Sequence, residues 1–329
     1  MKRLSTIILV SLCFAISGAA QDITINAPNS VANTTCGAVN NCALSPSEDH
    51  IIQVNIPCAG NWNFSLCGSA FNTKMYLTTA LCGGSTLASN DDFCGLQSEF
   101  TVTLGIGIYY VSIEGATALD CGNYTLLVTD DEAPVIVNCQ SNIAVTNDAG
   151  DCGAVVNFSA PSATDNCVLS SFTSNHNSGE LYPVGTTTVI YTATDGGGNV
   201  TNCSFDITVT DTEDPAIANC PSNITVSNSA NQCGATVSWA VPVASDNCNV
   251  NSFTTTHSPG AFFPLGTTTV TYTATDDAGN STTCTFTVTV NDTQAPSLAC
   301  PSTTTVNNNP GLCGATVTYT VTGTDNCPG

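Results

Sequence analysis

Side chains that could bind a metal ion gather in one loop in the front part of the chain. The segment SNDDFCG places Asn90, Asp91 and Asp92 next to one another. Oxygen ligands of this kind suit calcium, which takes six to eight oxygens and so needs more than three adjacent side chains. The alternative is a turn rich in Asp and Asn that precedes a cysteine. Asn90, Asp91 and Asp92 are the candidate Ca2+ ligands, and no other cofactor is expected.

A second set of carboxylates recurs before a proline at three places, in TDDEAP, TDTEDP and NDTQAP. The carboxylates of the first two segments could hold calcium between two domains. They are Asp130, Asp131 and Glu132, then Asp211, Glu213 and Asp214. The third segment keeps Asp292 but has no Glu, which favours the alternative of solvated linker charge.

The common motifs of catalytic nucleophiles and zinc hydrolases are not present in this sequence, which has no G-x-S-x-G and no H-E-x-x-H. His176 and His257 recur at one position of a repeat without a carboxylate or Ser fixed beside them, so a role in loop packing is favoured. Trp62 and Trp239 lie in alternating segments and are assigned to the core. A hydrolase that uses carboxylates alone leaves no sequence signature, so that class stays open. We predict a protein that is not an enzyme.

The first residues carry the pattern of an export signal. Lys2 and Arg3 precede an apolar run that closes on small residues at Ala20, which predicts a signal peptide over residues 1–20. The run is too short for a membrane span, so no membrane insertion is expected after its removal. Beyond it, Lys74 is the only Lys or Arg, against 25 acidic residues. A surface this acidic repels phosphate groups, which argues against nucleic-acid partners. The signal peptide predicts a secreted or cell-surface protein.

The cysteines reveal an internal repeat. Eighteen of the 19 follow residue 20, and no C-x-x-C occurs, which in an exported chain predicts disulfides rather than metal sites. Four cysteines of one repeat recur with identical spacing in a second repeat, and a third, partial copy follows. They are Cys139, Cys152, Cys167 and Cys203, then Cys220, Cys233, Cys248 and Cys284, then Cys300, Cys313 and Cys327.

Four cysteines allow three pairings, and the partial copy favours one of them. If Cys313 pairs locally with Cys327, only Cys300 is left without a partner. By this reasoning the inner pairs are Cys152–Cys167 and Cys233–Cys248, and the outer pairs are Cys139–Cys203 and Cys220–Cys284. The front region has seven cysteines, so one of them is free, paired outside its domain or paired with Cys300.

The strand signals predict an all-β protein. Short alternating runs such as CSFDITV and FTVTLGIGIYYVSIEG are typical of half-buried strands, and no segment has a helical period. With a length of about 80 residues, each repeat has the size of a small β-sandwich. We therefore expect disulfide-stapled tandem β-sandwich domains over residues 21–130, 131–211, 212–292 and 293–329.

Two family resemblances follow from these residues. The repeats resemble the hyalin (HYR) repeat, an immunoglobulin-like extracellular module. The resemblance rests on the motif order CxxNIxV, CGAxV, DNC, PxGTTTVxYTATDxxGN and CxFxxTVxD, and it covers residues 133–290 and a partial copy from Pro296. The front region resembles the pre-peptidase C-terminal domain, a jelly-roll-like appendage of secreted proteins. The resemblance rests on the order of the segments GNWNFSLCGSAFNTKMYL, NDDFCGLQSEFTVTL, YYVSIEG and GNYTLLV.

The resemblances imply a non-catalytic role. The hyalin repeat implies adhesion or spacing outside the cell, toward an extracellular protein or glycan ligand. The front domain implies surface attachment and, in some relatives, calcium. The alternative is a non-catalytic accessory part of a secreted peptidase or other hydrolase whose catalytic module is missing from this chain.

Overall fold

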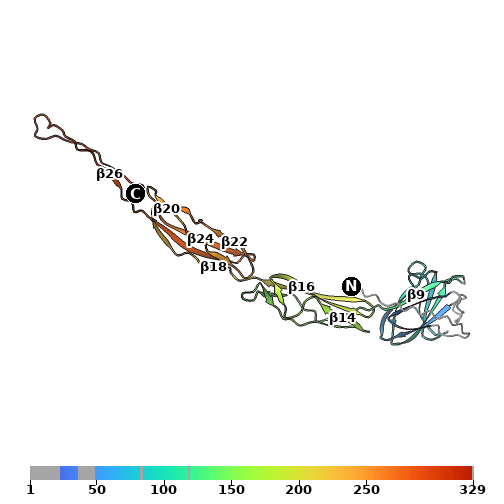
Figure 1. Cartoon of the computed structure of the whole chain (residues 1–329). Helices are drawn as coiled ribbons and strands as arrows, with labels where there is room; N and C mark the ends of the chain where they lie inside the picture. The colour runs from blue at the N-terminus through green and yellow to red at the C-terminus, as the bar shows by residue number, and fades with distance from the viewer. Residues whose placement is uncertain (1–22, 36–48, 82–83, 118, 328–329) are drawn as a thin grey trace. The chain divides into compact units, whose positions relative to one another are not determined.

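The computed structural model describes residues 23–35, 49–81, 84–117 and 119–327, and every regular element within them is a β-strand (Figure 1). The expected all-β class is confirmed. Within the same residues no helix is long and apolar enough to cross a membrane. The signal peptide expected over residues 1–20 lies outside the described part, as do Cys36, Cys42 and Cys82.

The chain forms two compact units, and the division between them falls inside the first repeat. The first unit holds the described residues up to Ile143 with Asn157–Glu180 and Thr188–Asp206. The second holds Ala144–Val156, Leu181–Thr187 and the described residues from Ile207 onward. The domain limits expected from the sequence stay predictions.

The N-terminal region is a sandwich of two sheets. The five-stranded sheet has the order β1 (Ile23–Asn26), β3 (Asp49–Ile56), β8 (Gly107–Gly115), β5 (Thr73–Thr78) and β6 (Thr86–Asn90). The four-stranded sheet has the order β2 (Asn29–Thr34), β9 (Asn123–Asp130), β4 (Gly60–Ser65) and β7 (Glu99–Leu104).

The alternation seen in the sequence builds the core of this sandwich. Ile52 and Val54 on β3 and Phe64 on β4 are inaccessible to solvent, as is Trp62. The Trp62 indole donates its Nε1 hydrogen to the Cys58 carbonyl at 3.3 Å, so its one polar group is satisfied. Trp62 is thus a core residue, as expected.

Each of the two complete repeats has eight strands. Repeat 1 comprises β10 (Val135–Val137), β11 (Ile143–Thr146), β12 (Gly153–Val155), β13 (Ser162–Thr164), β14 (Leu169–Ser174), β15 (Leu181–Pro183), β16 (Gly185–Asp195) and β17 (Val200–Thr210). Repeat 2 comprises β18 (Ala216–Ala218), β19 (Ile224–Ser227), β20 (Gly234–Val237), β21 (Val243–Ser245), β22 (Val250–Thr255), β23 (Ala261–Pro264), β24 (Gly266–Asp276) and β25 (Ser281–Asn291).

The two repeats share one topology. In repeat 2 a four-stranded sheet of order β19-β25-β24-β22 is accompanied by the two-stranded sheets β18-β21 and β20-β23. The same order recurs in repeat 1 as β11-β17-β16-β14, β10-β13 and β12-β15. Two tandem β-sheet modules of one topology are therefore present, as the sequence predicts.

The long hairpin β24-β25 supplies the core of repeat 2. Tyr272 on β24 lies opposite Cys284 on β25 in register, and both are buried with Phe286 and Val288. Trp239 packs edge-on against Phe286 and donates its indole hydrogen to the Tyr272 hydroxyl at 2.9 Å. Burying an aliphatic or aromatic side chain of this size contributes about 1.5–3 kcal/mol, so each of these side chains stabilises the repeat.

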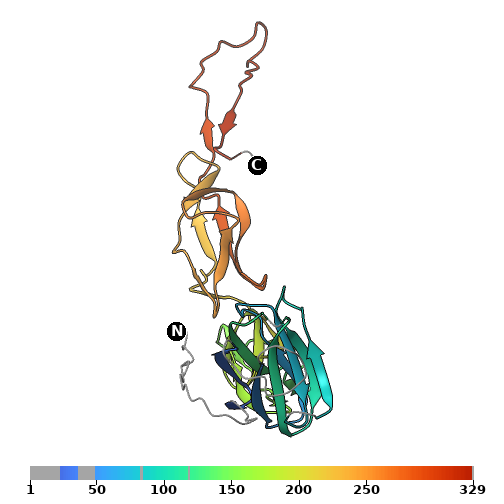
Figure 2. The same ribbon diagram turned by 90° about the vertical axis from the view of Figure 1, so that its right-hand side faces the viewer.

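The described part of the third copy has two strands, β26 (Ser297–Ala299) and β27 (Thr322–Thr324), joined by a long loop (Figure 2). Val317, Tyr319 and Val321 alternate in this loop and are exposed. They correspond by the repeat to Val237, Trp239 and Val241, of which Val237 and Trp239 belong to the core of repeat 2.

Candidate functional site

Both complete repeats have a disulfide within themselves. Cys139 is bonded to Cys203, and Cys220 is bonded to Cys284. These are the outer pairs expected from the sequence. Cys203 and Cys284 are buried on β17 and β25, so each bond ties the first residues of its repeat to the core hairpin.

The expected inner pairs are wrong, because those cysteines link consecutive parts of the chain. Cys152 is bonded to Cys248, and Cys167 is bonded to Cys58 of the N-terminal sandwich. Between Cys152 and Cys167 run β12 and β13, which belong to different sheets, so a short separation in sequence does not bring these two cysteines together. Cys167 instead packs against the N-terminal core.

The same finding corrects the other two inner pairs and explains the odd cysteine count. Cys248 is bonded to Cys152, so it cannot form the expected bond with Cys233. Cys313 and Cys327 are not bonded to each other. Of the three alternatives for the seventh front cysteine, pairing outside the domain is the one found, at Cys58.

We call the residues around Cys58–Cys167 junction 1. The amide Nδ2 of Asn166 donates to the carbonyl of Ala59 at 3.2 Å. The backbone N–H of Cys167 donates to Asp165 Oδ2 at 2.9 Å, which fixes the turn that presents the sulfur. The disulfide is therefore accompanied by a side-chain hydrogen bond to the main chain beside its partner cysteine.

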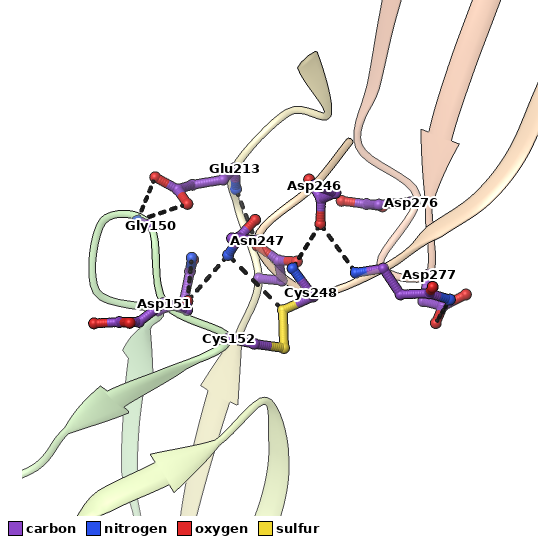
Figure 3. Close-up of a disulfide and its surroundings, with 12 residues drawn as sticks. Gly150, Asp151, Cys152, Glu213, Asp246, Asn247, Cys248, Asp276 and Asp277 are labelled. Atoms are coloured by element: carbon purple, nitrogen blue, oxygen red, sulfur yellow. Dashed lines mark hydrogen bonds between the residues drawn. A yellow bond between two sulfur atoms is a disulfide. The ribbon is translucent and has the colours of Figure 1, made fainter. Parts of the chain in front are cut away.

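We call the residues around Cys152–Cys248 junction 2, and it repeats this arrangement (Figure 3). Asn247 Nδ2 donates to the carbonyl of Asp151 at 3.0 Å. The backbone N–H of Cys248 donates to Asp246 Oδ2 at 2.9 Å. The recurrent tripeptide DNC thus has three separate tasks: the Asp caps the turn, the Asn binds a carbonyl and the Cys forms the bond.

The acidic segments before each proline contribute to the same junctions. Asp130 and Asp211 are 3% and 4% exposed, so the expectation of solvated linker charge is wrong for both. Glu132 accepts a hydrogen bond from the Asn61 backbone N–H at 3.4 Å in junction 1. Glu213 accepts from the Gly150 backbone N–H at 3.1 and 3.0 Å in junction 2 (Figure 3).

Junction 1 brings together three carboxylates from distant parts of the sequence, those of Asp130, Asp165 and Asp195. Their oxygens lie within 4.8 Å of one another, and Asp130 Oδ2 and Asp165 Oδ1 are buried without a hydrogen-bond partner. Burial raises the pKa of Asp130; hydrogen bonds from the Glu132 backbone and the Asn166 side chain oppose this, and the charges of Asp165 and Asp195 add to it. Three converging carboxylate oxygens could hold a cation such as calcium, or share a proton.

The hairpin turn of each repeat also reaches its junction. Asp276 Oδ1 accepts from the backbone N–H groups of Gly279 and Asn280 at 2.6 and 2.7 Å. Asn280 Nδ2 donates to Asp276 Oδ2 and, at 3.2 Å, to the carbonyl of Asp211. Burial of Asp276 opposes ionisation, but the hydrogen bonds from Asn280 and its neighbours outweigh it and lower the Asp276 pKa. Asp195 and Asn199 repeat this pattern toward the carbonyl of Asp130.

The structure does not gather Asn90, Asp91 and Asp92 into a defined metal site. Asn90 ends β6 and its side-chain Oδ1 is buried without a partner, whereas Asp91 and Asp92 are exposed. Among the described residues, no cluster of His, Cys, Asp and Glu ligand atoms includes Asp91 or Asp92. A calcium site at these three residues stays a prediction.

Three other groupings of potential ligands contain cysteines that are already bonded. Cys67 and Cys94 lie beside Glu99, but they form a disulfide with each other. A disulfide sulfur cannot supply the thiolate that binds a soft metal. These three groupings are therefore structural, whereas the grouping of Asp292, Asp325 and Cys327 contains a free thiol.

The two histidines differ in surroundings. His176 Nδ1 lies 3.3 Å from Glu180 Oε2, so a carboxylate is beside it after all. The position corresponding to Glu180 in repeat 2 is Ala261, and His257 packs on the ring of Phe263 at 5.3 Å. No shared catalytic arrangement follows from the recurrence of these histidines.

The fold and the junctions define the class of protein: an array of β-sandwich modules joined by disulfides, which is typical of chains exposed to an oxidising environment outside the cell. Residues 129–209 and 210–290 each match the HYR domain. The chain therefore carries two tandem HYR domains, and the protein is secreted or at the cell surface.

Individual relatives share parts of the chain. Hyalin of Strongylocentrotus purpuratus is 36% identical over 182 residues, which are 54% of this chain and 15% of hyalin. The Sushi, von Willebrand factor type A, EGF and pentraxin domain-containing protein 1 of Rattus norvegicus is 36% identical over 168 residues, which are 49% of this chain and 4% of that protein. The chain thus spans only a small part of these relatives.

The chain is also similar to the solved pre-peptidase C-terminal domain of a collagenase from Bacillus anthracis. The TM-score is 0.27 and the identity 16%, over 34% of this chain and 99% of that domain.

Proposed function

We propose that this chain is an extracellular spacer of an adhesion protein whose length under load is limited by interlocked disulfides. The observation that supports the proposal is that the disulfide-closed loops overlap along the sequence. They run from Cys58 to Cys167, Cys139 to Cys203, Cys152 to Cys248 and Cys220 to Cys284. A pulling force applied to such a chain travels across the bonds instead of along the loops.

The covalent path from Cys58 to Cys284 is short even when the modules unfold. At about 3.4 Å per extended residue, the backbone between these two cysteines spans about 770 Å. A path through three disulfides uses only the segments 152–167 and 220–248, which together span about 150 Å. Unfolding therefore releases little length.

Disulfides within a repeat and disulfides between modules can replace each other in keeping this path short. Without Cys152–Cys248, the path runs through Cys139–Cys203 and still spans about 150 Å. Without Cys220–Cys284 it spans about 170 Å, and without both bonds it spans about 370 Å. Only the loss of both Cys152–Cys248 and Cys220–Cys284 lengthens the path strongly, by about 220 Å relative to the chain without Cys152–Cys248.

Single-molecule pulling of the full chain tests this proposal. The handles are attached at residues 57 and 285, which are exposed and flank the two end cysteines of the path. Every protein in the experiment carries Cys327→Ala, so that the free thiol at this position cannot add a further bond to the path.

We expect the parent, Cys152→Ala/Cys248→Ala and Cys220→Ala/Cys284→Ala proteins to reach nearly the same maximal extension. The variant lacking all four cysteines should extend by about 220 Å more, and a reducing agent should release the full length in every protein. Unfolding steps of a whole repeat in the oxidised parent, about 280 Å each, would overturn the proposal.

The proposed binding partner is inferred from the relatives. Hyalin and the pentraxin-domain relative contain segments similar to this chain, and we propose that an extracellular protein or glycan is the partner. Beads coated with the oxidised chain should retain matrix glycans or proteins, and beads coated with a sandwich domain of unrelated sequence serve as the control. Equal retention by both beads would refute a binding role and leave the spacer role to the pulling experiment.

A further inference from the structure

Two cysteines without an assigned partner occupy the positions that form the inter-repeat bond elsewhere. Cys233 is the counterpart of Cys152 in the second repeat, and both are followed by Gly and Ala. Cys327 ends the third DNC tripeptide, as Cys167 and Cys248 end the first two. Cys152 and Cys248 are bonded in the structure, whereas Cys233 and Cys327 are free thiols.

The hydrogen bonds that accompany the other junction disulfides are already present around these thiols. Asn326 Nδ2 donates to the carbonyl of Gln232 at 2.9 Å, as Asn247 does to that of Asp151. The backbone N–H of Cys327 donates to Asp325 Oδ1 at 2.8 Å. The turn that presents the sulfur is thus held in the same way as in junction 2.

The linker side of the arrangement is also preserved, with an amide in place of a carboxylate. Gln294 Oε1 accepts a hydrogen bond from the Asn231 backbone N–H at 3.0 Å, where Glu213 accepts from Gly150 in junction 2. The absence of a Glu from the third acidic segment therefore leaves the contact intact. A neutral acceptor is sufficient for this bond.

The two thiols lie close to each other. The Cys327 thiol is buried, and the Cys233 thiol lies near enough to contribute to its raised pKa. The Sγ of Cys327 also lies 3.9 Å from the carbonyl of Gln232, the residue that precedes Cys233. Cys300 and Cys313, by contrast, are exposed.

We propose that Cys233 and Cys327 form a disulfide in the exported protein, which covalently joins the second HYR repeat to the third copy. The proposal does not rest on the spacer function. It continues a rule that the structure follows twice, in which the cysteine of each DNC tripeptide bonds to a cysteine of the preceding module.

The reaction requires a disulfide-bearing oxidant, such as an extracytoplasmic thiol–disulfide oxidoreductase. The thiolate of Cys233 attacks one sulfur of the oxidant and releases a thiol, and Cys327 then attacks the Cys233 sulfur of the mixed disulfide. Two thiols of the protein lose two protons and two electrons, and the oxidant's disulfide is reduced to two thiols. Cys233 is the first nucleophile because it is the more accessible of the two thiols. Burial raises the pKa of Cys327 to about 12, together with the neighbouring Cys233 thiol and the charge of Asp292.

Mass spectrometry of the full exported chain tests this bond. The protein is alkylated under denaturing conditions with one reagent, reduced, and alkylated with a second. We expect Cys233 and Cys327 to carry almost only the second label, and a non-reduced digest to contain a peptide pair that links them. Cys300 and Cys313 serve as the internal reference for thiols.

A Cys327→Ala variant provides the matched test. Its Cys233 should become reactive toward the first label, while the Cys220–Cys284 bond persists as a sign that repeat 2 is folded. A Cys300→Ala variant should leave Cys233 and Cys327 protected. First-label modification of both cysteines in the parent would overturn the proposal, and so would a peptide pair linking Cys327 to Cys313.

Discussion

Removal of the Cys220–Cys284 disulfide should cost repeat 2 about 4.3 kcal/mol of its free energy of unfolding. The bond closes a loop with a sequence separation of 64 residues. The chain-entropy model gives about 14.5 cal/mol/K for a loop of this size, which is about 4.3 kcal/mol at 25 °C. Since a domain of this size shifts its Tm by roughly 4–8 °C per kcal/mol, the expected loss is about 17–34 °C.

Trp239 is the probe for this experiment. It packs against Phe286 in the core of repeat 2, and Trp62 is the only other tryptophan. A Trp62→Phe background therefore makes the fluorescence specific for repeat 2. The Cys220→Ala/Cys284→Ala protein and its parent are both made in this background and unfolded in guanidinium chloride.

Cys67→Ala/Cys94→Ala is the control, because this bond lies in the N-terminal sandwich. It should leave the Trp239 transition in place. A loss below about 1 kcal/mol in the Cys220→Ala/Cys284→Ala protein, with the bond verified in the parent by peptide mapping, would refute the loop-closure reasoning.

Three further substitutions have defined outcomes. Asp130→Asn, in the presence of a chelator, should raise the stability at pH 7. Because the pKa of Asp130 is raised in the folded state, the parent regains stability as the pH falls through that pKa. The difference in stability between the two proteins should vanish below about pH 3.9. Unfolding midpoints measured from about pH 7 to about pH 3 check this, and a lower midpoint for the variant at neutral pH would contradict it. Asn280→Ala removes the donor to Asp276 and to the Asp211 carbonyl and should cost about 1–3 kcal/mol in the Trp239 transition, so an unchanged midpoint would show that these bonds contribute nothing net. Gly279→Ala should cost about 1 kcal/mol by chemical denaturation, because Gly279 has φ +96° and open space around it; Gly314, which also has open space but no positive φ, is the matched control and should tolerate Ala.

The sequence carried enough information for the fold class because its signals are local. The alternation in β24 and β25 places Tyr272, Phe286 and Val288 on one face whatever the rest of the chain does. The regular spacing of the cysteines separates the repeats, and the inward position of Cys284 on its strand identifies one half of the outer disulfide. The Asp and Gly of the turn before β25 are likewise readable from residue type alone.

The candidate site could not be predicted to the same extent, because it is built from contacts between modules. Asp130, Asp165 and Asp195 are far apart in sequence, and no periodicity indicates that their carboxylates converge. Asp130 looked like solvated linker charge, since its neighbours are acidic and a proline follows. The recurrence of Asn in all three DNC tripeptides was the one available signal, and the hydrogen bonds of Asn166 and Asn247 explain it.

The sequence by itself determined the strands, their buried faces and the repeat that places every cysteine in an equivalent position. The tertiary structure alone decided which cysteines meet. Cys167 follows Cys152 closely in the sequence and Cys248 is 96 residues away from it, yet Cys152 bonds to the distant one. The physical reason is that β12 and β13 enter different sheets, and the contact between consecutive modules brings the distant sulfur within bonding distance.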